Sequence, residues 1–277
     1  MNAGNGVQSS PTALILAAGR RGRKDPVARL QDKSHKCLVE VDGVAMIERV
    51  IQALLDSGCC RRILVSIESK DILRELEQSR RWLHEGVITV VPSAPNLADS
   101  VLALAESAAP PLPLLITTAD NALHTPELIR DFVARARTNH RDVSVAVTRE
   151  QTVLADHPDE DIRFFRFRDG GYSFCNLFAI HSAAGLQSAR VFRSGGQFRK
   201  RPRQILKVFG AMTLLMYKLR ISSLEACFRR ISGKLGIDIR TVEVAYSFAP
   251  IDVDNPRTLA LSEKILKQRR AYQAASD

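Results

Sequence analysis

Cysteine and long apolar runs are both scarce in this sequence of 277 residues. The five cysteines are an odd number and include the adjacent pair Cys59 and Cys60, which does not suit a disulfide framework, and no cysteine or histidine spacing suits a zinc site. No apolar run reaches the roughly 20 residues that a helix needs to span a bilayer. Residues 1–10 are polar and lack the basic and apolar regions of a signal peptide. We therefore expect a cytoplasmic, reduced protein with a disordered tail over residues 1–10.

Aromatic residues are also few, at 6%, and the chain contains no recognised nucleic-acid-binding module. We therefore expect no nucleic-acid partner, although the net charge of +10 favours anionic partners in general. The remaining composition, 45% hydrophobic and 25% charged, is that of an ordinary globular protein. We expect a single domain over residues 11–277, which is a suitable length for one large α/β unit.

Apolar runs of strand length alternate with stretches of helical periodicity. We expect strands at residues 12–18, 61–67, 86–91, 112–118 and 142–148, and helices at residues 46–58, 71–83, 97–109 and 125–140. Gly58 is expected to end the first helix, and Thr125 and Pro126 to begin the last one. This order predicts a mostly parallel sheet with helices on both faces, which binds ligands beyond the carboxyl ends of its strands.

The first expected strand ends in a glycine-rich, basic loop, "AAGRRGRK", over residues 17–24. Gly19 and Gly22 allow backbone N–H groups to close around a phosphate, which the basic side chains would neutralise. A glycine-rich loop alone is a weak signal. The alternative, a buried strand followed by a solvated basic loop, therefore stays open.

Acidic residues stand at two places that suit a metal ion. Asp120 directly follows the fourth expected strand, and Asp252 and Asp254 alternate around Val253, so that both carboxylates share one face if the segment is extended. Mg²⁺ prefers carboxylates, waters and substrate phosphates, so a second carboxylate near Asp120 would complete a site. Two alternatives stay open: Asp120 as a helix cap or turn residue, and Asp254 as the cap of a helix that begins near Pro256.

These residues carry a resemblance to a known superfamily. Residues 14–23, 35–58, 117–129 and 251–263 are similar, in this order, to the glycine-rich loop, lysine segment, metal-aspartate segment and closing acidic motif of the nucleotidyltransferases. These enzymes include molybdenum cofactor guanylyltransferases, cytidylyltransferases and nucleotide-sugar pyrophosphorylases. The resemblance covers about residues 13–266. It implies an α/β fold with a Rossmann-like, mostly parallel sheet of the nucleotide-diphospho-sugar transferase type.

The resemblance also implies a nucleoside triphosphate as substrate and Mg²⁺ as cofactor. The residues that it assigns to nucleotide binding are Leu16, Ala17, Ala18, Gly19, Arg20, Gly22, Arg23, Lys36, Ser100 and Asp120. Lys36 matches the family lysine that contacts the transferring phosphate, and Arg23 and Asp120 complete the implied catalytic group. Asp120 and Asp254 are the implied metal ligands, with Asp252 as an open alternative to Asp254. The loop departs from the family pattern because Arg21 stands where glycine or serine is usual.

The implied reaction is attack by a small phosphorylated acceptor on the α-phosphorus of the nucleotide, with release of pyrophosphate. CTP is favoured over GTP because "LADSV", residues 97–101, resembles the cytidylyltransferase segment. Asn176, in a strand expected within residues 169–180, is the candidate for contacting the acceptor. Two alternatives stay open: a glycosyltransferase, which would use the Asp-Val-Asp motif of residues 252–254, and a catalytically silent nucleotide-binding protein. The oligomeric state is also open.

A basic helical insertion is expected over residues 182–236. Within it, residues 198–236 combine two apolar helical stripes with two basic clusters: Arg199, Lys200, Arg201 and Arg203, then Arg229, Arg230 and Lys234. Two interpretations stay open. The segment is either a pair of helices packed on the domain with solvated basic faces, or a peripheral contact with anionic lipid at the inner face of a membrane.

Overall fold

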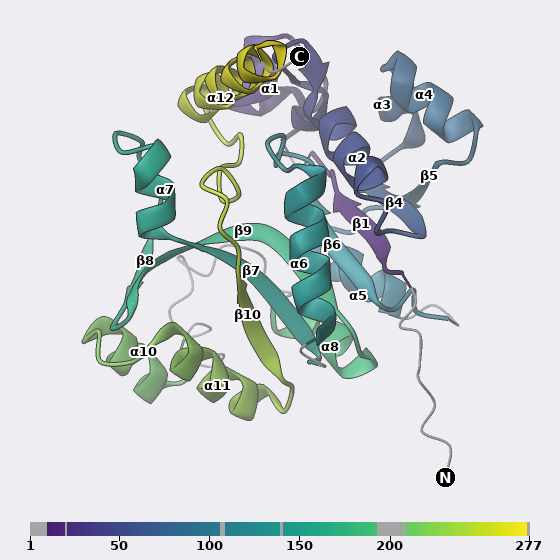
Figure 1. Cartoon of the computed structure of the whole chain (residues 1–277). Coiled ribbons are helices and arrows are strands. Elements are labelled where there is room, and N and C mark those ends of the chain that lie inside the picture. The colour runs from purple at the N-terminus through teal and green to yellow at the C-terminus, as the bar shows by residue number, and fades with distance from the viewer. Residues whose placement is uncertain are drawn as a thin grey trace.

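An eight-stranded sheet forms the centre of the fold (Figure 1). The computed structural model describes residues 10–19, 21–105, 109–138, 141–192, 206 and 209–275. The strands of the sheet are β1 Thr12–Leu16, β4 Arg62–Ile67, β5 Ile88–Pro92, β6 Leu114–Thr118, β7 Val143–Arg149, β8 Phe165–Phe167, β9 Gly170–Ile180 and β10 Ile239–Glu243. They follow the order β10-β7-β9-β6-β1-β4-β5, and β8 pairs with β9. A separate hairpin joins β2 (Glu40–Val41) to β3 (Val44–Ala45).

Helices lie between these strands, and one more follows the last strand. They are α1 Pro26–Leu30, α2 Met46–Ser57, α3 Lys70–Arg74, α4 Glu77–His84, α5 Leu97–Ala105, α6 Pro126–Thr138, α7 Glu150–Asp156, α8 Ala183–Ser188, α10 Ala211–Lys218, α11 Leu224–Leu235 and α12 Pro256–Ala274. The described residues also form the 3-10 helices η1 Gly22–Lys24, η2 Lys36–Leu38 and η3 Ala189–Phe192. Within the described residues, no helix is both long enough and apolar enough to cross a membrane.

The mostly parallel sheet predicted from the sequence is confirmed. Strand β1 pairs in parallel with β4 and β6, β4 with β5, and β7 with β10. Strand β9 is antiparallel to both β6 and β7 and joins the two parallel groups. Because parallel strands end at the same edge, the segments that follow β1 and β6 lie beside one another there.

Helices cover both faces of the sheet, as predicted. On one face, Ile15 belongs to the same core cluster as Ile51 of α2 and Phe132 of α6. On the other face, Leu14 packs in a second cluster with Val101 of α5. Neighbouring residues of β1 thus enter different cores, because successive side chains of a strand point to opposite faces.

The helical predictions need one correction. Residues 71–83 belong to two short helices, α3 and α4, rather than to one continuous helix. The break falls at Leu76, whose backbone is extended (φ −101°, ψ 131°) and whose side chain packs against the main core. Helix α2 ends as predicted at Gly58, which adopts the left-handed conformation that glycine tolerates (φ +63°).

The described part of the expected insertion is helical. Helix α11 packs Ile231 against Val143 and Val145 of β7, so this helix is attached to the sheet. The first basic cluster, Arg199 to Arg203, lies outside the described residues, as do residues 1–9 of the expected tail.

Candidate active site at the carboxyl edge of the sheet

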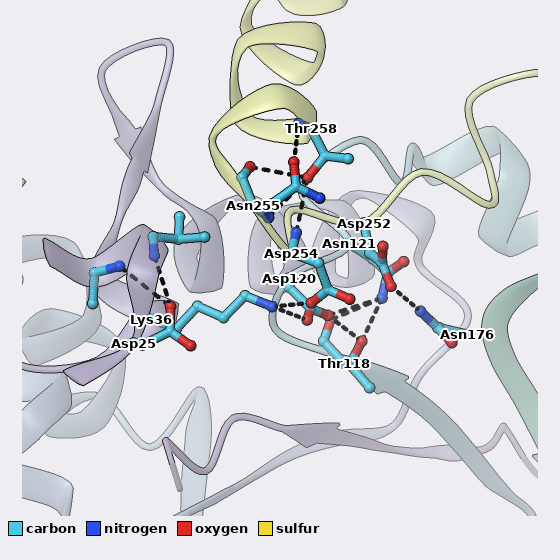
Figure 2. A network of polar contacts seen from close by, with 12 residues as sticks. Asp25, Lys36, Thr118, Asp120, Asn121, Asn176, Asp252, Asp254, Asn255 and Thr258 are labelled. Carbon is cyan, nitrogen blue, oxygen red and sulfur yellow. Dashed lines mark hydrogen bonds and ion pairs between the residues drawn. The ribbon is translucent and has the colours of Figure 1, made fainter. Parts of the chain in front are cut away.

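Three distant segments of the chain meet at the carboxyl edge of the sheet (Figure 2). The turn after β6 is held against β1 because Ala119 N donates to the Leu16 carbonyl at 3.1 Å. The segment before α12 lies against this turn because Val253 N donates to the Asp120 carbonyl at 3.0 Å. The 3-10 helix η2 begins with Lys36, whose side chain reaches both segments.

Three carboxylates gather where these segments meet. Asp120, Asp252 and Asp254 each offer one oxygen, and these atoms lie within 4.8 Å of one another. We call these three residues the acidic cluster. Carboxylate oxygens are ligands that Mg²⁺ prefers, so these three residues fit the Mg²⁺ ion that the sequence analysis implies.

Lys36 is the cation of this site. Its Nζ donates to Asp120 Oδ2 at 2.7 Å and to Asp254 Oδ1 at 2.5 Å, and its side chain is only 18% exposed. Burial works against the charged ammonium, but the two carboxylates outweigh burial and raise the pKa of Lys36 above its ordinary value. Lys36 is therefore held charged beside the acidic cluster.

Asp252 is the more buried of the two carboxylates in the Asp-Val-Asp motif. Burial, followed by the charges of Asp254 and Asp120, raises the pKa of Asp252 to about 7. Asn176 Nδ2 donates to Asp252 Oδ2 at 3.0 Å. Asn176 has a positive φ of 49° within β9, where the pairing with β7 is irregular. This local departure from strand geometry brings an asparagine from β9 against the acidic cluster.

Thr118 and Asn121 fix the orientation of Asp120, and the sequence analysis did not assign a role to either. Thr118 Oγ1 donates to Asp120 Oδ1 at 2.5 Å, and the fully buried Asn121 donates from Nδ2 to Thr118 Oγ1 at 2.5 Å. The available signal was the cluster of polar residues in "TTADN", residues 117–121, at the end of an apolar strand.

Helix α12 is capped by Asn255 and not by Asp254. The Asn255 side chain accepts hydrogen bonds from the backbone N–H groups of Arg257 and Thr258, both at 3.0 Å, and Thr258 Oγ1 accepts one from Asn255 N at 3.2 Å. This is a complete capping box. The alternative in which Asp254 caps the helix is therefore wrong, and the Asp254 carboxylate contacts Lys36 instead.

The glycine-rich loop approaches the same edge of the sheet. A Cβ atom on Gly19 would lie 2.7 Å from Cδ2 of His35, so the imidazole ring occupies the space of a side chain. Gly22 has a φ of +47°, and its N–H donates to the Gly19 carbonyl at 2.7 Å. Glycine is therefore needed at residue 19 for close approach and is favoured at residue 22 by conformation.

The structure unites some of the expected site residues and separates others. Lys36, Asp120 and Asp254 are in direct contact, and Asn176 joins them through Asp252. Arg20 lies outside the described residues.

The remaining loop residues and Ser100 have other neighbours. Leu16 and Ala17 are buried, and Ala18 is half-buried. Arg23 is exposed and pairs with Asp32 at 3.2 Å. The buried Ser100 Oγ accepts from Ala94 N at 2.9 Å and donates to the Asn96 carbonyl at 3.3 Å.

Fold and site together define the class of protein. Backbone N–H groups in a glycine-rich turn after the first strand favour a phosphate, and the acidic cluster favours a hard cation, at the sheet edge where such folds bind ligands. This combination indicates an α/β protein for phosphate-bearing nucleotides. Residues 13–229 match the model of the MobA-like NTP transferase domain, and the chain belongs to this family.

Curated relatives resemble part of the chain. It is 34% identical over 134 residues to the 2-C-methyl-D-erythritol 4-phosphate cytidylyltransferase of Rhodococcus opacus (strain B4), a match that covers 47% of this chain and 53% of the relative. The enzyme of the same name from Nocardia farcinica (strain IFM 10152) is 32% identical over 145 residues, which cover 52% and 59% of the two chains. The chain thus spans about half the length of the curated relatives that it matches.

Solved structures share the whole fold. A hypothetical transferase from Thermus thermophilus superposes with a TM-score of 0.72 at 22% identity, covering 91% of this chain and all of that one. A CMP:2-keto-3-deoxy-manno-octonic acid synthetase in complex with CTP superposes with a TM-score of 0.61 at 15% identity, covering 94% and 100%. At these identities the likeness shows the fold alone.

Proposed function

We propose that this protein is a nucleotidyltransferase that transfers a nucleoside monophosphate from a nucleoside triphosphate to a small phosphorylated acceptor. The observation that carries the proposal is the contact of Lys36 with Asp120 and Asp254 beside the glycine-rich loop. This arrangement supplies a fixed cation and a cation-binding cluster at one place, as nucleotide phosphates require. CTP is the favoured nucleotide, with GTP as the alternative, because the curated relatives are named as cytidylyltransferases.

The reaction asks for positioning and charge neutralisation rather than for a strong base. An oxygen of the acceptor phosphate, already anionic, forms a bond to the α-phosphorus, the bond from that phosphorus to the bridging oxygen of the β-phosphate breaks, and pyrophosphate leaves. Lys36 would donate to the phosphate oxygens as their negative charge reorganises. Asn176, which contacts Asp252 of the acidic cluster, would orient the acceptor.

Mg²⁺ fits the acidic cluster, with Asp120 and Asp254 as its proposed ligands and Asp252 as the alternative to Asp254. When bound, it would neutralise charge on the nucleotide phosphates. Thr118 and Asn121 would keep the Asp120 carboxylate turned toward that ion. The loop of Gly19 and Gly22 would contact the nucleotide through its backbone.

The test is a thermal-shift screen with CTP, GTP, ATP and UTP in the presence of Mg²⁺, followed by pyrophosphate release with phosphorylated polyols as acceptors. A ligand that binds only the folded state stabilises it by roughly 2.7 kcal/mol at a hundredfold excess over its dissociation constant. We expect the largest shift with CTP and release of pyrophosphate only when an acceptor is present.

Three other outcomes would overturn parts of the proposal. If a nucleotide raises the melting temperature but no acceptor leads to pyrophosphate release, the protein is a catalytically silent nucleotide-binding protein. Turnover of nucleotide sugars in place of nucleoside triphosphates would indicate a glycosyltransferase. The absence of any shift with all four nucleotides would contradict nucleotide binding itself.

A further inference from the structure

Helix α10 combines an apolar sequence with an exposed position. Its residues read AMTLLMYK, and Thr213 is its one buried residue. Five of the exposed side chains on and beside this helix are large and apolar: Leu206 48%, Met212 64%, Leu215 50%, Leu219 57% and Ile221 51% exposed. A helix that is apolar on most sides is normally buried, so this exposed apolar surface indicates an interaction site.

The stretch of sequence that contains this helix is strongly basic. No Asp or Glu occurs between Asp169 and Glu225, whereas nine Lys and Arg residues fall in that interval. The net charge of the whole chain is +10, so the rest of the sequence is close to neutral. Lys218 and Arg220, both exposed, follow the apolar side chains of α10 directly.

The carboxylates at the two ends of this interval are already engaged. Glu225 lies 3.3 Å from Arg240 and 3.7 Å from Arg229. Asp169 accepts from the Leu224 backbone N–H at 3.0 Å and from the Tyr172 hydroxyl at 3.3 Å. The surface that contains Met212, Leu215, Lys218, Leu219, Arg220 and Ile221, which we call the α10 surface, therefore keeps an excess of positive charge.

We propose that the α10 surface docks on an anionic lipid bilayer. Its apolar side chains would enter the boundary between headgroups and acyl chains, while Lys218 and Arg220 would stay at the level of the lipid phosphates. A nucleic acid would use the positive charge but not the apolar side chains. A second copy of this chain would bring a surface of the same sign and be repelled.

Docking in this orientation leaves the candidate active site accessible. Figure 1 shows α10 and α11 at the bottom of the view and α12 at the top, and the N-terminal end of α12 adjoins the acidic cluster. The ring of Tyr217 lies 5.2 Å from that of Phe167, which attaches α10 to the body of the protein. The docking proposal rests on exposure and charge and does not depend on the proposed function.

The test is sedimentation of the full chain with vesicles. One set contains phosphatidylglycerol and phosphatidylcholine in equal amounts and the other phosphatidylcholine alone, each at low and at physiological salt. We expect binding to the anionic vesicles that weakens with added salt, and little binding to the neutral ones. Each basic residue near an anionic surface contributes roughly fivefold to partitioning, so Lys218→Gln with Arg220→Gln should weaken binding about 30-fold.

A second variant separates lipid from other partners. Met212→Gln, Leu215→Gln and Leu219→Gln together should weaken vesicle binding without adding a negative charge. The matched control replaces the exposed Arg80 and Arg81 of α4 by glutamine and should bind like the wild type. Circular dichroism melts verify that each variant is folded.

Five results would overturn the proposal. The first four are no sedimentation with anionic vesicles at low salt, unchanged binding by both α10 variants, equal loss in the α4 control, and tight binding of duplex DNA that the apolar variant retains. Light scattering that shows a dimer dissolved by the α10 substitutions would assign the surface to a second copy instead.

Discussion

The carboxyl edge of the sheet and the α10 surface both concentrate charge, but they do so in opposite ways. At the sheet edge, the partly buried Lys36 lies 2.7 Å from Asp120 and 2.5 Å from Asp254. Around α10, Lys218 and Arg220 are exposed within a long interval that has no acidic residue. Close charges of opposite sign in a sheltered site are strongly coupled, whereas exposed charges of one sign act additively and are screened by salt.

Because of this difference, a single substitution has a larger effect in one region than in the other. Removing one member of a coupled, partly buried group leaves its partners uncompensated, and the effect of one substitution is then large. Removing one exposed charge from a surface of uniform sign changes its attraction for an anion by a small step. We therefore expect steep effects at the sheet edge and graded ones on α10.

The largest effect should come from Asp120→Asn. This change keeps the shape of the side chain but removes the charge that faces Lys36 and the proposed cation, and we expect turnover to fall by at least about 10²–10³-fold. Pyrophosphate release measures the effect, and a thermal melt should show a folded protein. Asp71→Asn, on the exposed start of α3, is the control.

The same assay ranks the remaining carboxylates. Asp254→Asn should act like Asp120→Asn, and Asp252→Asn should be milder. Near-normal turnover of Asp120→Asn would contradict its role, and the reverse order within the Asp-Val-Asp motif would make Asp252 the second metal ligand.

Lys36→Ala should have the next largest effect. The ammonium matters most while charge reorganises on the phosphate, so we expect kcat to fall by about 10²-fold and the KM for the nucleotide to change much less. Lys33→Ala is the matched control, because Lys33 is a nearby lysine that pairs with Glu40 at 2.7 Å. A change in KM alone would remove Lys36 from the catalytic group and leave it as a binding residue.

A smaller effect concerns the stability of the metal-free protein. The pKa of Asp252 is raised to about 7 in the folded state, above its value of about 4 in an unfolded chain. Ionised Asp252 therefore destabilises the fold, by an amount that is absent below about pH 4, grows up to about pH 7 and is constant above. Asp252→Asn should raise the melting temperature in EDTA, and more at pH 8 than at pH 5.

The expected gain at pH 8 is a few kcal/mol, because the folded and unfolded pKa values differ by about 3 units. Asp161→Asn, a substitution at an exposed aspartate, is the matched control. A gain of equal size at both pH values would mean that the strain at Asp252 is not electrostatic.

The smallest effect should come from the caps of two helices, one in each region. Asn255→Ala removes the cap of α12, and Ser223→Ala removes the bond from Ala226 N to Ser223 Oγ (3.2 Å) that caps α11. Each change should destabilise the protein by about 1 kcal/mol in urea unfolding. Only Asn255→Ala should also lower turnover, because Asp254 precedes it. Equal turnover in the two variants would show that the site tolerates movement of α12.

Several features of the fold were predictable from local sequence. Hydrophobic periodicity located β1, β4, β5, β6 and β7, and the glycine at residue 58 marked the end of α2. These signals are local because side-chain alternation and helix capping involve residues only a few positions apart. The break at Leu76 could not be predicted in this way, since it depends on the core against which Leu76 packs.

The site residues also divide into those that local sequence identified and those that depend on the fold. The order of residues along the chain was enough to place a glycine-rich loop after β1, aspartates after β6 and before α12, and a basic stretch between residues 170 and 224. The folded chain was needed to see that Lys36 contacts Asp254, which is 218 positions away. It was also needed to see that Asn255 caps α12 in place of Asp254, and that a positive φ brings Asn176 to Asp252. The physical reason is that charge and periodicity are properties of the chain, whereas the coupling of charges depends on distance and burial, which exist only once the sheet has brought its strand ends together.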